Sequence, residues 1–212
     1  MCYRHYNFAL DFLSKLCLSE KFSDVSFKCG EQSIPAHKTI LAASSPFFEN
    51  ELFSEANKEK TEFHFDCKPE IFEYVLRYIY TDLLSNLCLN EKFSDVHFKC
   101  GDHSVPAHKT ILAASSPFFE DALLSEENKE KTEINLDCKP EVFEYVLRYI
   151  YTGKMNVEDL SDNDVIGLFT LIQKMQLPRL LNAVTKRMNT IEMSVENVGL
   201  MYEPAVETKS NI

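Results

Sequence analysis

The chain has 212 residues, of which 45% are hydrophobic and 26% charged, a typical globular composition for one or two domains. Its net charge of -11 argues against a nucleic-acid-binding protein, because such proteins present a basic surface to phosphate groups. An acidic surface is more typical of a protein that binds other proteins.

Residues 1–12 form an N-terminal extension ahead of the first recognisable pattern. Asp11 interrupts its apolar residues and no small-residue cleavage site follows, so we expect no signal peptide. No apolar run in the chain reaches about 18 residues, so we expect no membrane span.

An internal repeat organises the rest of the chain. Residues 13–81 match residues 84–152 without a gap, at a shift of 71 positions and with 14 differences in 69. We call residues 13–83 copy one and residues 84–190 copy two. Only copy two continues past Thr152 into a long stretch of helical pattern, so copy one is a truncated unit.

The cysteines follow the repeat. Three of the seven lie in copy one, three lie at the matching positions of copy two, and Cys2 stands alone: Cys17, Cys29 and Cys67 correspond to Cys88, Cys100 and Cys138. An odd number without closely spaced pairs argues against a disulfide framework. We therefore expect reduced thiols and a cytoplasmic or nuclear location.

The first half of copy two combines a short helical segment with a hairpin. Residues 84–88 carry apolar side chains at helical spacing, and residues 96–100 alternate as a strand with one buried face. The pair Gly101-Asp102 signals a turn before a second strand at residues 104–107. We expect these two strands to pair.

The second half predicts helices around one more strand. Residues 110–124 read as two short helices that break near Pro117, because the residue before proline avoids helical geometry. After a charged loop, residues 132–136 alternate as a third strand. Pro140 begins a helix that Gly153 ends. Two closing helices follow, the first capped at Ser161 and the second beginning at Pro178. The prediction is an α/β (α+β) fold with a small sheet covered by helices.

The junction between the copies predicts a rod. No glycine or proline occurs between Pro69 and Gly101, and apolar residues recur there at three- and four-residue steps. We expect the last helix of copy one to run into the first helix of copy two, or nearly so, and such a rod would hold the copies apart. Two interpretations of copy one remain open: a passive relic of duplication, or an internal partner of copy two. Since it lacks closing helices, part of its apolar surface should stay exposed or be covered by another body.

These motifs resemble the BTB/POZ domain family. The resemblance rests on residues 93–98, on residues 105–119 (VPAHKTILAASSPFF) and on the stretch from Phe143 to Gly153, all correctly ordered and spaced. Copy two resembles a complete domain and copy one its front part, and the style is nearest to speckle-type and BTB-domain-containing-9 proteins. Residues 191–212 resemble the start of a BACK domain, cut short.

The resemblance implies dimerisation and, in many members, docking onto cullin-3 as an adaptor of a ubiquitin ligase, with no enzyme activity. Cullin binding in such adaptors uses a hydrophobic-x-Glu motif before the third strand. Here the matching triplets are Leu124-Ser125-Glu126 in copy two and Phe53-Ser54-Glu55 in copy one. We expect the copy-one triplet to be the poorer site, because copy one lacks the helices that complete the groove. A structural interpretation remains open, in which Leu124 packs inward and Glu126 is solvated.

The dimer interface of the family uses the leading helix and a charged pair. The matching residues here are Leu84, Leu87, Leu89, Asp95 and Lys109. Copy one repeats them as Leu13, Leu16, Leu18, Asp24 and Lys38. Asp95 has an alternative role as a cap of local backbone amides.

We find no candidate catalytic, cofactor or metal residues. His37 and His108 lie between alanine and lysine with no ligand three or four residues away, so we interpret them as packed histidines. No C-x-x-C and no phosphate-binding glycine motif occurs. The leading hypothesis is a dimerising cullin-3 adaptor that binds itself or other BTB proteins. The alternatives are a repressor-like self-association scaffold, or a fragment that sequesters full-length partners.

Overall fold

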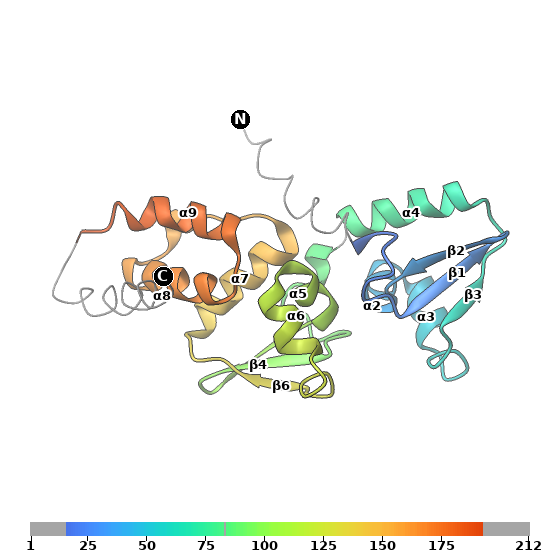
Figure 1. The fold of residues 1–212 in the computed structure, drawn as a ribbon, viewed down its shortest axis with the longest axis horizontal. Coiled ribbons are helices and arrows are strands. Elements are labelled where there is room, and N and C mark those ends of the chain that lie inside the picture. The colour runs from blue at the N-terminus through green and yellow to red at the C-terminus, as the bar shows by residue number, and fades with distance from the viewer. Residues whose placement is uncertain (1–15, 83, 193–212) are drawn as a thin grey trace.

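The computed structural model describes residues 16–82 and 84–192 (Figure 1). The predicted N-terminal extension, residues 1–12, lies outside the described residues, and so does nearly all of the predicted BACK-like segment, residues 191–212. In the part of the chain that is described, no helix combines the length and the apolar character that a membrane crossing needs.

Each copy folds around its own three-stranded sheet. In copy one the strand order is β2-β1-β3, with β1 (Val25–Cys29), β2 (Gln32–Ala36) and β3 (Glu62–His64). The helices of copy one are α2 (Lys38–Ser44), α3 (Pro46–Phe53) and α4 (Pro69–Asp82).

Copy two repeats this arrangement and extends it. Its strand order is β5-β4-β6, with β4 (Val96–Cys100), β5 (His103–Ala107) and β6 (Glu133–Asn135). Its helices that match copy one are α5 (Lys109–Ser115), α6 (Pro117–Leu124) and α7 (Pro140–Thr152). The closing elements are η2 (Val157–Asp159), α8 (Asp162–Lys174) and α9 (Pro178–Met188). The mixed α/β fold predicted from the sequence is therefore confirmed.

The sheets follow from strand alternation. Val96, Phe98 and Cys100 are buried on one face of β4, as their period of two predicts. The predicted hairpin is confirmed, because β4 and β5 pair antiparallel with Phe98 opposite Val105. The third strand, β6, pairs parallel to β4 with Ile134 opposite Phe98. Its parallel direction was not part of the sequence prediction.

The helix boundaries follow from caps. Ser116 separates α5 from α6, and its side-chain oxygen accepts the amide hydrogen of Phe118. Gly153 ends α7 in the left-handed conformation, with φ at 66°, and its N–H donates to the carbonyl of Tyr149. Ser161 caps α8 by accepting from the amide of Asp164. These three boundaries confirm the sequence prediction.

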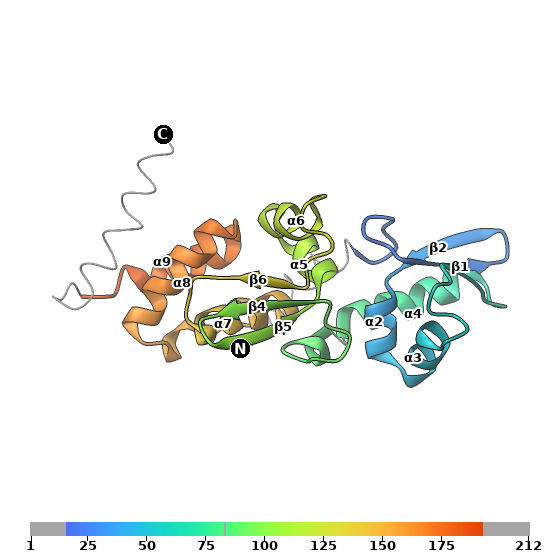
Figure 2. The ribbon, with the colours of Figure 1, turned by 90° about the horizontal axis from the view of Figure 1, so that it is seen from below.

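The last helix of copy one and the first helix of copy two follow each other almost directly, as expected, but the prediction that they hold the copies apart is wrong. Helix α4 ends at Asp82, and the chain continues as a short 3-10 helix, η1 (Leu84–Leu87). The η1 helix contacts α2 and α4 of copy one and α7 of copy two, and Leu87 is almost fully buried. The apolar spacing across the junction therefore serves two packing contacts rather than one helix face. The two copies lie side by side instead of being held apart (Figure 2).

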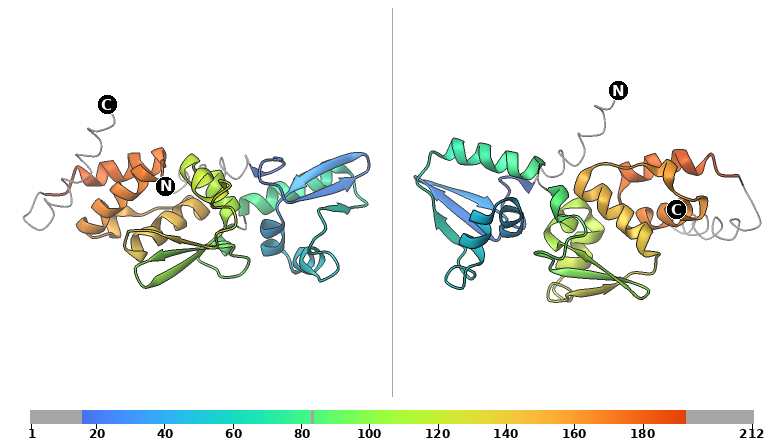
Figure 3. Two further views of the ribbon diagram at one scale, coloured as in Figure 1. Left: turned by 60° about the horizontal axis from the view of Figure 1, so that its bottom comes forward. Right: turned by 180° about the vertical axis from the view of Figure 1, so that it is seen from behind.

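The closing helices lie at the far end of the molecule from copy one. Helices α8 and α9 pack against each other, and α8 packs against α7 (Figures 1 and 3). No described element occupies the corresponding position on α4. This asymmetry is the main structural difference between the two copies.

Candidate protein interaction surfaces

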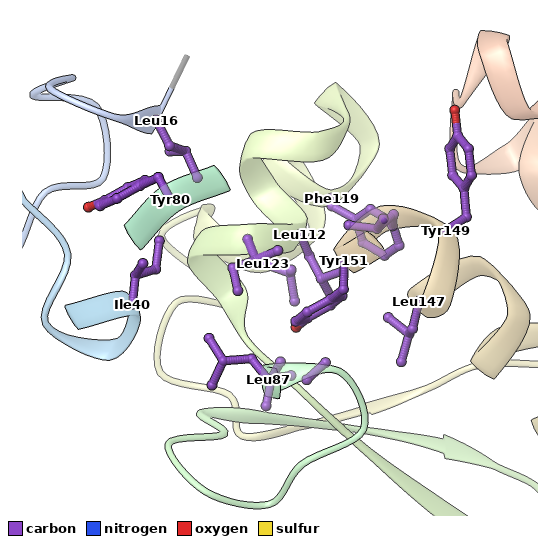
Figure 4. Close-up of a cluster of buried hydrophobic side chains, with 14 of the residues drawn as sticks. Leu16, Ile40, Tyr80, Leu87, Leu112, Phe119, Leu123, Leu147, Tyr149 and Tyr151 are labelled. Carbon is purple, nitrogen blue, oxygen red and sulfur yellow. The ribbon is translucent and has the colours of Figure 1, made fainter. Parts of the chain in front are cut away.

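The two copies share one apolar core. Buried residues of both copies form a single connected cluster. Ile40 of α2 and Leu87 of η1 are almost fully buried, and Figure 4 shows Ile40 on the copy-one side with Leu87 and Leu123 on the copy-two side. Burial of apolar side chains from both copies, where α2 meets η1, gives the contact a hydrophobic centre. Copy one is therefore packed against copy two, as one of the two interpretations of the truncated copy supposed.

Reciprocal ion pairs join the copies at the surface. Lys21 of copy one binds Glu120 of copy two at 2.7 Å, and Lys92 of copy two binds Glu49 of copy one at 2.7 Å. The shift of 71 that relates the copies converts one pair into the other. Reciprocity of this kind is the mark of a two-fold interface between equivalent units. The contact between the copies is therefore an internal pseudo-dimer.

The loops that carry the two lysines have the same unusual backbone. Phe22 and Phe93 each have φ at 64°, in the left-handed region that costs a non-glycine residue about 1–2 kcal/mol. Phe93 lies against Phe53 of the other copy, with ring centroids 5.2 Å apart. Lys92 also lies over the Phe93 ring, at 5.1 Å from its centroid. The contact between the copies thus helps to offset the backbone strain.

Sequence reasoning missed the ion pairs. Each charged residue occurs in both copies: Lys21 corresponds to Lys92, and Glu49 corresponds to Glu120. The sequence does show that both copies carry the same lysine and the same glutamate. It does not show which faces of the copies meet, so the pairing could not be predicted.

The copy-two triplet lies where the sequence placed it, after α6 and before β6. Leu124 is half-buried and packs against the core, and Ser125 ends the helix. The side chain of Glu126 is 89% exposed and forms an ion pair of 2.8 Å with Lys129. Leu124 packed against the core beside a solvated Glu126 is the structural interpretation that the sequence left open. Cullin binding by these residues stays a prediction.

The copy-one triplet has a different environment. Glu55 is exposed and paired with Lys58 at 2.9 Å, like its counterpart. Phe53 is 42% exposed, yet its ring lies against Phe93 of copy two. Its anchor side chain is thus partly engaged by the internal pseudo-dimer.

The predicted charged pair of the dimer interface acts locally in this structure. Asp95 accepts the backbone N–H of Lys109 at 2.7 Å, which caps α5, and the Lys109 ammonium donates to the carbonyl of Lys129. Partial burial of its carboxyl group raises the pKa of Asp95, and the Lys109 amide opposes that rise. The local capping role of Asp95 is thus observed, and a role between chains stays a prediction.

The three leucines predicted for the dimer interface lie just after the junction between the copies. Leu87 is buried at the contact between the copies, and Leu89 is half-buried with φ at 57°. Leu84 begins η1, and its side chain lies outside the described residues. Involvement of these leucines in pairing between chains stays a prediction.

The two histidines are packed, as predicted. The Nδ1 atom of His37 lies 2.6 Å from the Tyr80 hydroxyl, and His108 has the same partner in Tyr151 at 2.8 Å. The Nε2 atoms face the carbonyls of Lys21 and Lys92, in the loops of the pseudo-dimer. Burial lowers the pKa of both imidazoles. Among the described residues no cluster of potential metal ligands occurs.

Two thiol pairs are close in space although distant in sequence. The sulfur atoms of Cys29 and Cys67 are 3.6 Å apart, and those of Cys100 and Cys138 are 3.7 Å apart. Burial raises the pKa of Cys29 to about 11 and that of Cys138 to about 12. Cys29 and Cys138 are therefore poorly ionised at neutral pH. The reduced state of the thiols stays a prediction.

The matching helices α4 and α7 differ in how much of their apolar surface is exposed. On α4, Ile71 is 58% and Val75 39% exposed, whereas their counterparts on α7, Val142 and Val146, are 3% and 0% exposed. The predicted exposure of an apolar surface on the truncated copy is confirmed.

Comparison with known proteins connects these features. The sequence model of the BTB/POZ domain matches residues 13–87 and again residues 84–192. Kelch-like protein 41 of Mus musculus is 36% identical over 118 residues, which cover 53% of this chain and 19% of that protein. BTB/POZ domain-containing protein 9 of Drosophila melanogaster is 31% identical over 124 residues, which cover 58% of this chain and 17% of that protein. The match thus spans less than a fifth of either relative.

Solved structures of such domains are also similar. The BTB domain of zebrafish PATZ1 aligns with a TM-score of 0.44 and 25% identity, over 52% of this chain and 91% of that one. The BTB domain of human gigaxonin aligns with a TM-score of 0.42 and 23% identity, over 58% of this chain and 95% of that one. Since the family's sequence model matches nearly the whole chain, in two consecutive stretches, the chain belongs to the BTB/POZ domain family.

Proposed function

We propose that the chain is an adaptor that pairs its two copies internally and docks cullin-3 through copy two. As a member of the BTB/POZ family, the chain is a protein-interaction module. The proposed partner is cullin-3, and the proposed surface is the triplet Leu124-Ser125-Glu126. The observation that carries it is the exposed carboxylate of Glu126 beside the half-buried Leu124, at the end of α6.

The chemistry of this surface suits a protein partner. An apolar anchor supplies binding energy when a partner covers it, and a carboxylate at its side fixes orientation. The ion pair of Glu126 with Lys129 is exposed, so a partner's cation can replace Lys129 at little cost.

Copy one is proposed to contribute pairing rather than docking. Its anchor Phe53 contacts Phe93, and among the described elements its helix α4 lacks a partner like the one that α7 has in α8. We propose that the pseudo-dimer fulfils within one chain the pairing that other members achieve between chains. An isolated chain should then behave as one 24.5 kDa unit in dilute solution.

Light scattering on a sizing column tests both parts. The full chain is run alone and with the N-terminal domain of cullin-3, as wild type and as the matched variants Glu126→Lys and Glu55→Lys. We expect one chain per cullin domain, loss of the complex with Glu126→Lys, and a retained complex with Glu55→Lys.

Other outcomes are equally informative. Absence of a complex with the wild-type chain would refute the adaptor proposal and favour a self-association scaffold. Equal loss of binding with both variants would refute the assignment to copy two. A chain that runs alone as a stable dimer would refute the proposal that internal pairing replaces pairing between chains.

A further inference from the structure

The exposed face of α4 has a counterpart in the same molecule that is covered. This face consists of Ile71, Tyr74 and Val75, and we call it the open face. From residue 66 to residue 81 the sequence of copy one differs from that of copy two at one position, where Ile71 replaces Val142. Two nearly identical segments thus differ in exposure because only one of them has closing helices.

Copy two shows how the covered face is occupied. Val142 lies against α8, where a Cβ atom on Gly167 would be 3.9 Å from Cγ2 of Val142. Tyr145 is half-buried beside η2, lining a hollow with Met155 and Asp159. Val146 has no exposed surface. The α7 face that carries Val142, Tyr145 and Val146 is therefore the surface on which η2 and α8 lie. We call this surface, and the matching surface of α4, a seat.

Two polar anchors fix the ends of α8 on that seat. Lys139 binds Asp164 in the first turn of α8 at 2.7 Å, and the pKa of Asp164 is lowered by this bond. Ser116 donates its hydroxyl hydrogen to the carbonyl of Met175, just past the end of α8. The two anchors set both the position and the direction of the helix.

Copy one keeps both anchors. Lys68 stands at the position of Lys139, and Ser45 stands at the position of Ser116. Ser45 also keeps the local bond, because its side chain accepts the amide hydrogen of Phe47 as Ser116 accepts that of Phe118. The apolar and polar parts of the seat are thus both present in copy one.

We propose that the open face of α4, with Lys68 and Ser45 at its ends, binds a helix pair of the α8–α9 kind that another protein chain supplies. The partner helix carries an acidic residue in its first turn for Lys68. It has a small residue three positions later to fit Ile71, as Gly167 follows Asp164 in α8. Its C-terminal carbonyl meets Ser45. This surface is separate from the copy-two triplet proposed for cullin-3.

The partner is another chain because this chain's own closing helices are in use. Within residues 16–82 and 84–192, each chain has two seats and one α8–α9 pair, of which α8 already packs on α7. If two molecules of this chain exchanged their α8–α9 helices, each α4 seat that was filled would leave one α7 seat empty. A foreign helix pair covers the open face without that loss.

The test uses a probe taken from the chain itself, a labelled peptide of residues 154–190 that contains η2, α8 and α9. Its binding to the full-length protein is followed by fluorescence anisotropy. We expect saturable binding of one peptide per chain, retained by Ile71→Val, which makes the seat match that of copy two. Val75→Glu should weaken binding at least tenfold.

A charge exchange identifies the seat. Lys68→Glu should weaken binding severalfold, and the peptide variant Asp164→Lys should restore it. Lys139→Glu is the matched control in copy two and should leave peptide binding unchanged. If Lys139→Glu weakens binding and Lys68→Glu does not, the peptide has displaced α8 from copy two, and the proposal is refuted.

A second experiment attaches the peptide to the protein, in case the free peptide does not fold. The same segment is fused to the C-terminus of the full chain through a flexible glycine-serine linker, and amide hydrogen exchange of residues 70–80 is measured. We expect slower exchange in the fusion, and no slowing when the fusion carries Val75→Glu. Unchanged exchange together with no binding of the free peptide would overturn the proposal. So would a chain that self-associates through α4 and is returned to monomer by Val75→Glu, because the occupant would then be a second copy.

Discussion

Helices α4 and α7 have almost the same sequence and nearly opposite surroundings. The face that includes Val146 is buried beneath closing helices, whereas the face that includes Val75 is exposed. The amphipathic pattern of the segment explains why both form helices and why Leu76 and Leu147 both point into a core. It does not determine whether the second apolar side of the helix is covered. That property belongs to the elements that follow, which only copy two possesses.

The largest expected difference comes from placing a charge on that second side. Val146→Asp should lower the free energy of unfolding by about 3–5 kcal/mol, because it leaves an unpaired charge in a buried position. Val75→Asp should change it by less than about 0.5 kcal/mol, as at other exposed positions. Urea denaturation followed by circular dichroism measures both. Similar losses for the two variants would mean that the open face is covered in solution.

The next prediction concerns a feature that the copies share. Tyr80→Phe and Tyr151→Phe each remove a buried hydroxyl that binds the backbone N–H and the imidazole of the neighbouring histidine. Each should cost about 1–3 kcal/mol, since a buried polar group loses its partner. The two losses should agree closely because the surroundings agree. A much smaller loss for Tyr80→Phe would indicate that copy one is not packed as described.

Acid should weaken both copies together. Burial lowers the pKa of His37 and His108 in the folded chain, so the unfolded chain, with histidine near 6.5, binds protons more readily. Their contribution to stability is therefore complete above about pH 6.5 and falls as the pH decreases towards the folded-state pKa values. Urea midpoints at pH 7 and pH 5 should show a decrease at the lower pH. The decrease should be smaller in the double variant His37→Gln with His108→Gln.

The smallest effect is expected at the ion pairs between the copies. Lys21 and Glu120 are both more than a third exposed, so Lys21→Glu should cost less than about 1 kcal/mol. Addition of Glu120→Lys should restore the loss, and high salt should reduce both effects. The same cycle at Lys92 and Glu49 should give a similar value. Coupling absent from both cycles would contradict the reciprocal interface.

The sequence predicted the local structure of each copy well. Strand alternation, the break before Pro117 and the cap at Ser161 are set by residues close in the chain, and the structure confirms them. The exposed apolar surface of copy one also followed, because the missing helices could be identified from the repeat.

Features that depend on contacts between distant parts could not be predicted in this way. The junction pattern around Leu87 fits one long helix as well as two packing contacts, and only the position of copy one decides between them. The pairing of Lys21 with Glu120 depends on which faces of the copies meet. The proximity of Cys29 and Cys67 likewise arises from the fold and has no close spacing in the sequence.

Amide hydrogen exchange of the two matching helices in one sample tests the central claim most directly. The segments 70–80 and 141–151 differ only at Ile71 and Val142, so their intrinsic exchange rates are nearly equal and their masses are distinguishable. The account predicts at least tenfold slower exchange in α7 than in α4, because α8 covers α7, whereas no described element covers the matching face of α4. Equal protection of the two helices would contradict it.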